Sequence, residues 1–457
     1  MARIFKPSRS GQGKSAQKSG EKAPRQLTIE SLSPEGRGIA RHQGKTVFVS
    51  GALPGETVEI SHYQRHKRYS ECQVKQVLTP SAHRVTAPCP HYQSCGGCQL
   101  QHLAVSQQLH EKQQSLLEAL KHQLPGKADF DVLPPITSTE SYRSRARVGV
   151  SREGRMGFRS RQSDQLIAVY HCQVLAPQLQ LVWAPLQLWL NGFSGASGVT
   201  HIELIASAFA GLEAEGSVIV IRHTRPIPEF QRQLLWQRLS ELEAPVCCWL
   251  QGAKNGALTP LVVDQPVLQS QYLLMNQSVT VRFEPSDFTQ VNRQVNEQMV
   301  IQAVDWLQLQ QDDVVLDLFC GIGNFTLPMA QQAGKVVGIE GVETMVERGR
   351  ANAELNRLDN VYFKALNLDQ PDLGSALKRE GANKFLLDPP RAGAKFICQQ
   401  WGQTDFESGV YVSCNPASLV RDAAILSQQG FELSAIRVLD MFPHTAHVET
   451  MALFTRV

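Results

Sequence analysis

The stretch Val314-Val-Leu-Asp-Leu-Phe-Cys-Gly-Ile-Gly-Asn-Phe325 decides how the second half of the chain folds. Val314 to Leu318 is a short apolar run with one carboxylate, a pattern typical of a strand buried within a parallel sheet. Gly321 and Gly323 let the backbone turn tightly and approach a ligand closely, because no Cβ stands in the way. The stretch therefore predicts a buried strand followed by a ligand-binding loop.

A helix and a second strand complete the unit. Asn324 is predicted to cap a helix that runs from Phe325 to Ala330. Lys335 to Ile339 is a second apolar strand that ends in Glu340, and an acidic residue at this spacing suits a pair of ribose hydroxyls. Together these features favour a nucleoside cofactor over a merely structural turn, although the loop lacks the full G-x-G-x-x-G fingerprint and a P-loop lysine. Asp317-x-Phe-x-Gly-x-Gly resembles motif I of S-adenosylmethionine-dependent methyltransferases.

The alternation of strands and helices continues to the end of the chain. An amphipathic helix ending near Leu309 precedes the first strand. Further strands are expected near Val361–Phe363, Lys384–Leu387, Val410–Ser413, Ala435–Leu439 and Thr450–Phe454, with helices such as Pro416–Gln429 between them. This predicts a doubly wound, Rossmann-like α/β domain over residues 286–457, with its chemistry at the carboxyl ends of the strands.

Composition limits the class of protein. The chain has 457 residues, enough for several domains, and no apolar run long enough to span a membrane. Ten cysteines are too sparse for a secreted disulfide scaffold, so metal binding is the better interpretation where they cluster. Residues 1–100 hold 15 Lys and Arg against 6 Asp and Glu, a charge of +9, whereas the remainder carries −6. We expect a cytoplasmic, monomeric protein whose basic front half meets a polyanion.

The front half divides into a tail and a barrel. Residues 1–22 are rich in Lys, Arg, Ser and Gly and are predicted to be disordered. Residues 23–83 show short alternating runs separated by turns, which predicts a small β-barrel. One predicted turn, from Tyr63 to Tyr69, interleaves aromatic and basic residues; it suits either RNA contact or a solvated hairpin tip. The run from Leu27 to Val58 resembles a TRAM domain, an OB-like RNA-binding barrel.

A group of cysteines follows the barrel. Cys89, Cys95 and Cys98 lie within ten residues, with Gly96 and Gly97 between the last two, so three thiols can converge on one inorganic centre. Cys172 is the best candidate for a fourth ligand, because the other cysteines lie in apolar contexts; Cys247 and Cys248, for example, are expected in a core. An iron–sulfur cluster is favoured, with zinc as the alternative, for which His91 or His102 would be available.

Residues 84–285 are predicted to form a central α+β domain that holds this centre. Residues 103–124 have leucines at helical spacing, and strands such as Val218–Arg222 follow. Arginines are dense between residues 143 and 161. Arg143, Arg145 and Arg147 alternate along a strand, and an RNA-facing strand is favoured over a solvated edge strand.

Three predicted strand ends in the last domain carry reactive groups. Asp388 ends a strand and precedes two prolines, which have no amide hydrogen. Cys414 lies beside a helix N-terminus, which is expected to lower the pKa of its thiol. Glu449 immediately precedes the final strand. A thiol and a carboxylate in a methyl-donor fold indicate C5 methylation of a pyrimidine: thiolate addition to C6 activates C5, and a base later removes the C5 proton.

These residues carry a specific resemblance. The chain is similar to the RNA uracil-5-methyltransferase family in Phe288-Thr-Gln-Val-Asn292, the glycine loop, Asp388-Pro-Pro-Arg391, Ser413-Cys-Asn-Pro416 and His447-Val-Glu-Thr450. One mild departure is Pro390, where alanine also occurs in the family. The combination of barrel and four cysteines resembles the branch that methylates 23S ribosomal RNA at uridine 1939.

The resemblance implies roles for individual residues. It makes Cys414 the nucleophile and Glu449 the base. It implies a [4Fe–4S] cluster on Cys89, Cys95, Cys98 and Cys172. It places contacts to S-adenosylmethionine at Gln290, Phe319, Asn324, Glu340, Asn367 and Asp388.

Other functions remain alternatives. The target uridine could lie elsewhere in ribosomal or transfer RNA, or the base could be a cytosine. A radical methylthiotransferase would need C-x3-C-x2-C, whereas this chain has C-x5-C-x2-C. A non-catalytic RNA-binding iron–sulfur factor would not need Cys414 and Glu449 at strand ends.

Overall fold

The computed structural model of the chain describes residues 23–124, 129–138, 141–161, 163–193, 198–253, 256–368 and 373–457. The described residues form two compact units, one of residues 23–33 with 37–82 and one of residues 34–36 with the described residues from 83 onward. The predicted tail, residues 1–22, lies outside the described residues. No helix in the described part of the chain is long and apolar enough to cross a membrane.

The first unit is a curled sheet of short strands. They are β1 (Gln26–Thr28), β2 (Ser31–Leu32), β3 (Gly38–His42), β4 (Lys45–Ser50), β5 (Thr57–Arg65) and β6 (Tyr69–Thr79). Their order in the sheet is β1-β5-β6-β4-β3-β2. Because β1 and β2 lie at opposite ends of this order but only two residues apart in the chain, the sheet curls back on itself. The predicted barrel is confirmed, and β2 and β3 are strands that the sequence pattern did not reveal.

The predicted aromatic and basic turn is mostly strand. Tyr63 and Arg65 belong to β5 and Tyr69 begins β6, so the turn itself is His66 to Arg68. The Arg65 guanidinium lies 5.8 Å from the centre of the Tyr63 ring, and His66 stacks on Tyr69 with ring centres 4.5 Å apart. One cation–π pair and one ring stack thus flank Lys67 and Arg68, the exposed residues of the turn.

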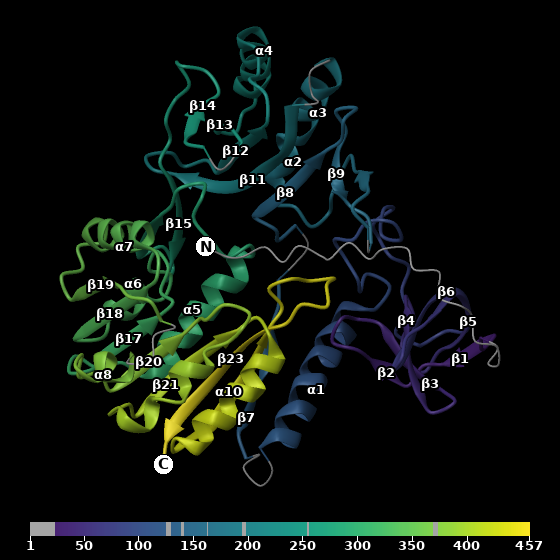
Figure 1. The fold of residues 1–457 in the computed structure, drawn as a ribbon. Helices are drawn as coiled ribbons and strands as arrows, with labels where there is room; N and C mark the ends of the chain where they lie inside the picture. The colour runs from purple at the N-terminus through teal and green to yellow at the C-terminus, as the bar shows by residue number, and fades with distance from the viewer. Residues whose placement is uncertain are drawn as a thin grey trace. The chain divides into compact units, whose positions relative to one another are not determined.

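The second unit contains a central sheet and a catalytic sheet (Figure 1). The central sheet has the order β10-β9-β8-β11-β12-β13-β14, and β15 pairs with both β11 and β16. Its strands are β8 (Arg145–Val150), β9 (Met156–Arg159), β10 (Leu166–Ala168), β11 (Val199–Phe209), β12 (Gly216–His223), β13 (Val246–Gln251), β14 (Leu258–Pro260), β15 (Ser270–Leu274) and β16 (Val279–Arg282). Helices α2 (Pro177–Leu181), α3 (Trp183–Gly192) and α4 (Glu229–Ser240) share a core with its strands. Cys247 and Cys248 are buried, as predicted.

The catalytic sheet has the order β19-β18-β17-β20-β21-β23-β22-β7. Its strands are β17 (Val314–Leu318), β18 (Lys335–Glu340), β19 (Val361–Ala365), β20 (Lys384–Leu387), β21 (Ser408–Ser413), β22 (Phe431–Leu439), β23 (Glu449–Arg456) and β7 (Asp131–Ile136). The first five in the order run parallel to one another, and β23 runs antiparallel to both its neighbours. The predicted doubly wound α/β domain is confirmed.

Helices cover both faces of this sheet, because alternate strand residues point to opposite sides. Val410 and Val412 join one core, with helices α5 (Arg293–Leu307), α6 (Thr326–Ala330) and α7 (Glu343–Leu355). Tyr411 joins the other core, with α1 (Val105–Gln123), α8 (Leu373–Lys378), α9 (Lys395–Cys398) and α10 (Pro416–Gln428). The carboxyl ends of the five parallel strands therefore meet at one edge, between two helical layers.

Two elements cross from the predicted central domain into the catalytic sheet. Helix α1 buries Leu116 and Leu120 in the same core as α10. Strand β7 pairs in parallel with β22 and extends the sheet by one strand. Residues 105–136 are thus part of the catalytic framework, although they precede the central sheet in the chain.

Candidate active site and thiol-lined pocket

The glycine loop leaves β17 in an unusual backbone conformation. Phe319, Gly321 and Gly323 have φ values of 65°, 57° and 101°. A Cβ on Gly323 would lie 3.0 Å from Leu327 Cγ and 3.1 Å from Phe363 Cζ, whereas a Cβ on Gly321 would meet nothing within 4 Å. The loop is therefore packed against the protein at Gly323 and borders open space at Gly321.

Glu340 closes this loop from the neighbouring strand. Its carboxylate accepts hydrogen bonds from the backbone N–H groups of Gly321 (3.2 Å), Gly341 (2.8 Å) and Val342 (3.1 Å). Two carboxylate oxygens offer about four lone pairs, so acceptor capacity remains for ribose hydroxyls. The predicted juxtaposition of glycine loop and strand-end acid is confirmed.

Asn324 is not the helix cap that the sequence predicts. Helix α6 begins at Thr326 without a side-chain cap. Instead, the Asn324 amide exchanges two hydrogen bonds of 3.0 Å with the Asn296 amide and accepts one of 3.0 Å from the Tyr272 hydroxyl. The side chain is turned toward α5 and β15, whose positions the local sequence does not reveal.

Gln290 and Asn367 lie around the same strand ends. Gln290 lines a small cavity with Tyr272 and Asn296, the two residues that bind Asn324. Asn367 is exposed two residues after β19. Gln290 is therefore close to the glycine loop, and Asn367 follows the strand next to β18.

Two carboxyl groups lie at the centre of the strand ends. Asp317 is fully buried and accepts a hydrogen bond of 2.5 Å from the Thr326 hydroxyl. Burial, and to a smaller extent the charges of Asp388 and Glu340, raise the pKa of Asp317 to about 8. Burial raises the pKa of Asp388 to about 7. A cationic ligand in this space would stabilise both carboxylates.

Cys414 and Glu449 come together from adjacent strands. In the register of β21 and β23, Ser413 lies opposite Thr450, so the next residue along each chain direction brings Cys414 beside Glu449. Glu449 is 4% exposed, and burial and the charge of Asp388 raise its pKa well above the ordinary value. Cys414 is half-buried. The structure thus places a thiol next to a carboxyl group whose pKa is raised by burial and by the charge of Asp388.

The predicted lowering of the Cys414 pKa is wrong. Burial and the charges of Glu449 and Asp388 raise it to about 11, and Arg391 offsets only part of this effect. Helix α10 does begin two residues later, with Asn415 as its cap. Its N-terminal dipole is worth less than desolvation together with two neighbouring carboxylates.

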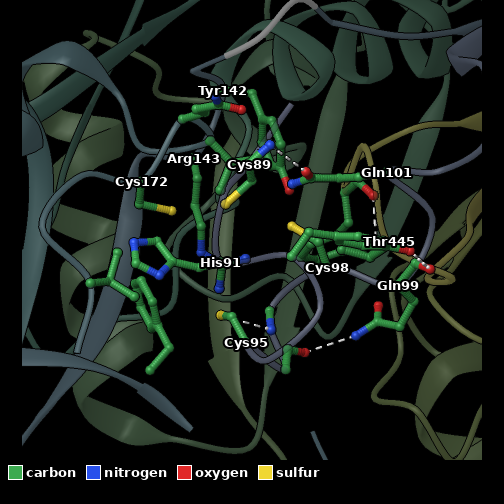
Figure 2. A pocket seen from close by; sticks show the side chains of 18 of the residues that line it. Cys89, His91, Cys95, Cys98, Gln99, Gln101, Tyr142, Arg143, Cys172 and Thr445 are labelled. Carbon is green, nitrogen blue, oxygen red and sulfur yellow. Dashed lines mark hydrogen bonds between the residues drawn. The ribbon is translucent and has the colours of Figure 1, made fainter. Parts of the chain in front are cut away.

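Cys89, Cys95, Cys98 and Cys172 line one cavity of about 340 Å³. Figure 2 shows their sulfur atoms facing a common space, which Cys172 reaches from a distant part of the chain. The Gly97 N–H donates to the Cys95 sulfur at 3.4 Å, as the glycine pair predicts. Burial and then the other three thiols raise the pKa of Cys98 to about 11. The four predicted ligands therefore lie together.

The four thiols line a cavity, and the structure does not bring them to one position that a metal ion could occupy. Among the residues that the structure describes, no group of three or more His, Cys, Asp or Glu is arranged to hold a single metal ion. Thiolates at ~2.3 Å from one zinc ion would lie within roughly 4 Å of one another. Of the two histidines considered for zinc, His91 lines the cavity, whereas His102 faces the Tyr92 hydroxyl at 2.5 Å.

The predicted RNA-facing arginines have divided roles. Arg145 is half-buried, pairs with Glu203 at 3.5 Å and donates to the carbonyls of Pro285 and Asp287. Arg147 is exposed. Both Arg143 and Arg147 line the thiol cavity. A strand with all three arginines facing RNA is therefore wrong for Arg145, which holds the loop that leads to Gln290.

Sequence reasoning missed that this cavity extends to residues 440–448, the loop between β22 and β23, which we call the catalytic loop. Phe442, Thr445 and His447, which lie just before Glu449, line it together with the cysteines. Burial and the charges of Arg391, Lys112 and Arg143 lower the pKa of His447. His444 and His447 stand out in the sequence just before Glu449, but the sequence does not reveal which segments they contact.

Comparisons with known proteins agree with this geometry. The sequence profile described as tRNA (Uracil-5-)-methyltransferase matches residues 104–457, and the TRAM domain profile matches residues 25–71. Proteins named 23S rRNA (uracil(1939)-C(5))-methyltransferase RlmD are similar over nearly the full length. The one from Hahella chejuensis is 41% identical, covering 94% of this chain and 96% of its own. The one from Vibrio vulnificus is 38% identical, covering 100% of both.

A solved structure supports the fold. The Pyrococcus abyssi tRNA (uracil-54, C5)-methyltransferase in complex with S-adenosyl-L-homocysteine aligns with a TM-score of 0.72 at 20% identity, covering 94% of this chain and 100% of that one. On the length of the profile match and the identity to its relatives, the chain belongs to the tRNA (Uracil-5-)-methyltransferase family.

Proposed function

We propose that the protein transfers the methyl group of S-adenosylmethionine to C5 of uridine 1939 in 23S ribosomal RNA. The observation that carries this proposal is the pairing of Cys414 with Glu449 at the strand ends that hold the glycine loop. The near full-length relatives named for this reaction support the choice of RNA and uridine.

The chain's own groups account for each bond change. The Cys414 thiol first loses its proton to water; the thiolate then bonds to C6 of a uridine that has left its stack, and the C5–C6 π electrons form an enolate. C5 then takes the methyl group, and the S–CH₃ bond breaks to leave S-adenosylhomocysteine. Glu449 removes the C5 proton, the C6–S bond breaks, and the C5–C6 double bond returns. Burial and the charge of Asp388 raise the pKa of Glu449, which favours uptake of a proton by its carboxylate.

The electrostatics of the strand ends support a cationic methyl donor. Burial raises the pKa values of Asp317, Asp388 and Glu449, and repulsion by the Asp388 charge raises those of Asp317 and Glu449 further. A sulfonium group would relieve that repulsion. We assign contacts with the donor to Gln290, Phe319, Asn324, Glu340, Asn367 and Asp388.

We further propose that the thiol cavity holds a [4Fe–4S] cluster. Four thiols line it, and the Gly97 amide donates to one of the sulfurs. Arg161 supports this loop by donating to the carbonyls of Tyr92 (2.7 Å) and Cys98 (2.9 Å). With four protein thiols as ligands, the cluster would serve structure; when bound, it would cross-link Cys172 to the segment that holds the other three.

In this proposal each domain has a separate role. Residues 23–83 and the basic tail supply RNA affinity, residues 84–285 hold the cluster, and residues 286–457 carry the methyl transfer. A basic, aromatic barrel suits phosphate contact and base stacking.

The test of the function is methyl transfer to protein-free 23S RNA, followed by mapping of the modified base. The expected product is 5-methyluridine at position 1939 alone. Cys414→Ala should give neither product nor covalent adduct while it still binds RNA. Methylation of another uridine or of a cytosine would refute the assigned target. If the parent protein binds RNA but transfers no methyl group, the alternative of a non-catalytic RNA-binding factor would be favoured.

A further inference from the structure

The loop just before Glu449 is held by the segment that carries the cysteines. The backbone N–H groups of Gln99 and Leu100, which directly follow Cys98, both donate to the His444 carbonyl at 2.9 Å. The Tyr142 hydroxyl donates to the Pro443 carbonyl at 3.2 Å. Figure 2 shows Gln99 and Thr445 together on the Cys98 side of the pocket.

One buried side chain stabilises the contact between the cysteine segment and the loop before Glu449. Gln108, on α1, is 0% exposed. Its Nε2 donates to the carbonyls of Leu100 (3.0 Å) and Leu103 (2.7 Å), and its Oε1 accepts from the His444 N–H at 3.1 Å. A single amide thus ties α1, the cysteine segment and the catalytic loop together, although 336 positions separate it from His444.

The held residue has little freedom, and the path from it to Glu449 is short. His444 has a φ of 66°, a left-handed conformation that is uncommon for residues other than glycine. The Thr445 hydroxyl then donates to the Phe442 carbonyl (2.8 Å) and accepts from the His447 N–H (3.2 Å). Two residues later, Glu449 begins β23. Because so few residues separate the two, a displacement of the His444 backbone should also displace Glu449.

We propose that Gln108 is a positioning residue for Glu449, and that through it the cysteine segment sets where the catalytic carboxylate lies. This inference rests on the proposed role of Glu449 as the base. Gln108 bonds to backbone groups and acts on the reaction only through the loop. Its loss is expected to impair the one step that needs Glu449, the removal of the C5 proton.

The informative substitution is Gln108→Met, which keeps length and volume but removes every hydrogen bond. Addition of Cys414 to C6 and methyl transfer should continue, because neither needs Glu449. Proton removal should slow by about 10- to 100-fold, since a misplacement of about 1 Å can cost a factor of that size. A methylated covalent protein–RNA adduct should then accumulate as a slow-migrating band on a denaturing gel.

A matched control lies on the same helix. Gln113 is half-buried on α1, and its Nε2 donates to the Leu133 carbonyl, away from the catalytic loop. Gln113→Met should show parental turnover and no adduct. Gln108→Glu keeps an acceptor for the His444 N–H but, even as the neutral acid, can donate to only one of the two carbonyls, so it should restore turnover only in part relative to Gln108→Met. If Gln108→Met does not fold, Gln108→Asn decides in its place, because its amide is one methylene too short to reach His444.

The adduct assay is repeated in the Glu449→Gln background. If Gln108 acts through Glu449, Gln108→Met should add nothing to the adduct lifetime there. Loss of activity without adduct, or an adduct lifetime that lengthens further in the double variant, would overturn the inference. A Glu449→Gln protein that itself forms no adduct would instead refute the proposed role of Glu449, whatever the Gln108 variants do.

Discussion

Glu449→Gln is expected to abolish turnover while leaving the fold at least as stable as that of the parent. Glu449 is 4% exposed, and burial and the charge of Asp388 raise its pKa well above the ordinary value. Both effects favour the neutral acid over the carboxylate. Glutamine copies its shape and its charge, so the substitution removes the titrating proton and little else.

The sign of the stability effect follows from linkage. The folded state holds the Glu449 proton more tightly than the unfolded state, so the free energy of unfolding falls as pH rises from the unfolded pKa, about 4.3, through the folded one. The loss is about 1.4 kcal/mol for each pH unit between the two values. Glutamine has no such loss. The melting temperature of Glu449→Gln at pH 8 should therefore equal or exceed that of the parent.

Turnover, unlike stability, should fall in Glu449→Gln. A general base contributes about 10²- to 10⁴-fold, so turnover should fall by that factor while Cys414 still attacks and the methyl group still transfers. The methylated RNA should remain bound to Cys414, which a denaturing gel with labelled methyl donor detects. Normal turnover would refute the reasoning, as would the absence of adduct in a variant that binds RNA and cofactor. The next candidates for the base would then be His447, whose lowered pKa keeps it neutral, and His444.

Four further predictions concern the cofactor, the nucleophile, the cluster and the RNA. Because the pKa of Asp388 is about 7, affinity for S-adenosylmethionine should fall about tenfold per pH unit below pH 7 and that for the uncharged S-adenosylhomocysteine should fall less; equal slopes in calorimetry would contradict this. Because the pKa of Cys414 is about 11, adduct formation with RNA containing 5-fluorouridine should rise about tenfold per pH unit from pH 7 to 10, and a plateau below pH 9 would count against it. Cys172→Ser should lose both the brown chromophore and soluble yield, and anaerobically purified parent protein with zinc and no iron would disprove the cluster. Lys67→Ala with Arg68→Ala should lower the salt slope of RNA binding by about 1.4 to 1.8, whereas an unchanged slope would exclude these residues from phosphate contact.

The catalytic fold could be predicted from the sequence because its strands are buried in a parallel sheet. Strands β18 and β20 are short apolar runs that end at Glu340 and just before Asp388, and β17 and β20 have the predicted bounds. The topology of such a sheet brings strand ends to one edge, so the glycine loop, Glu340 and Asp388 could be expected to lie together. Glu449 lies at this edge for a different reason: β23 runs antiparallel to β21, so its first residue meets Cys414 at the end of β21.

The errors arose where a distant segment determines the state of a residue. Asn324 looks like a cap in its own stretch, but its amide pairs with Asn296 on another helix. Cys414 lies near a helix N-terminus, yet burial and the carboxyl groups of Asp388 and Glu449 dominate its pKa. In each case the local pattern indicated a real tendency, and a stronger interaction from outside that stretch prevailed.

The path of the chain explains why the thiol cavity and the catalytic loop share a wall. After the cysteine segment, the chain enters α1, which packs on the catalytic core, and then β7, which pairs with β22; only afterwards does it build the central sheet. On α1, Lys112 forms a buried ion pair of 2.7 Å with Asp440, directly after β22. Breaking one partner of a buried pair costs several kcal/mol, because the other is left as an uncompensated charge. The cysteine segment is thus anchored to the catalytic sheet through α1 before Cys172 is reached, so a cluster at these thiols would tie the central sheet to a framework that already holds the catalytic loop.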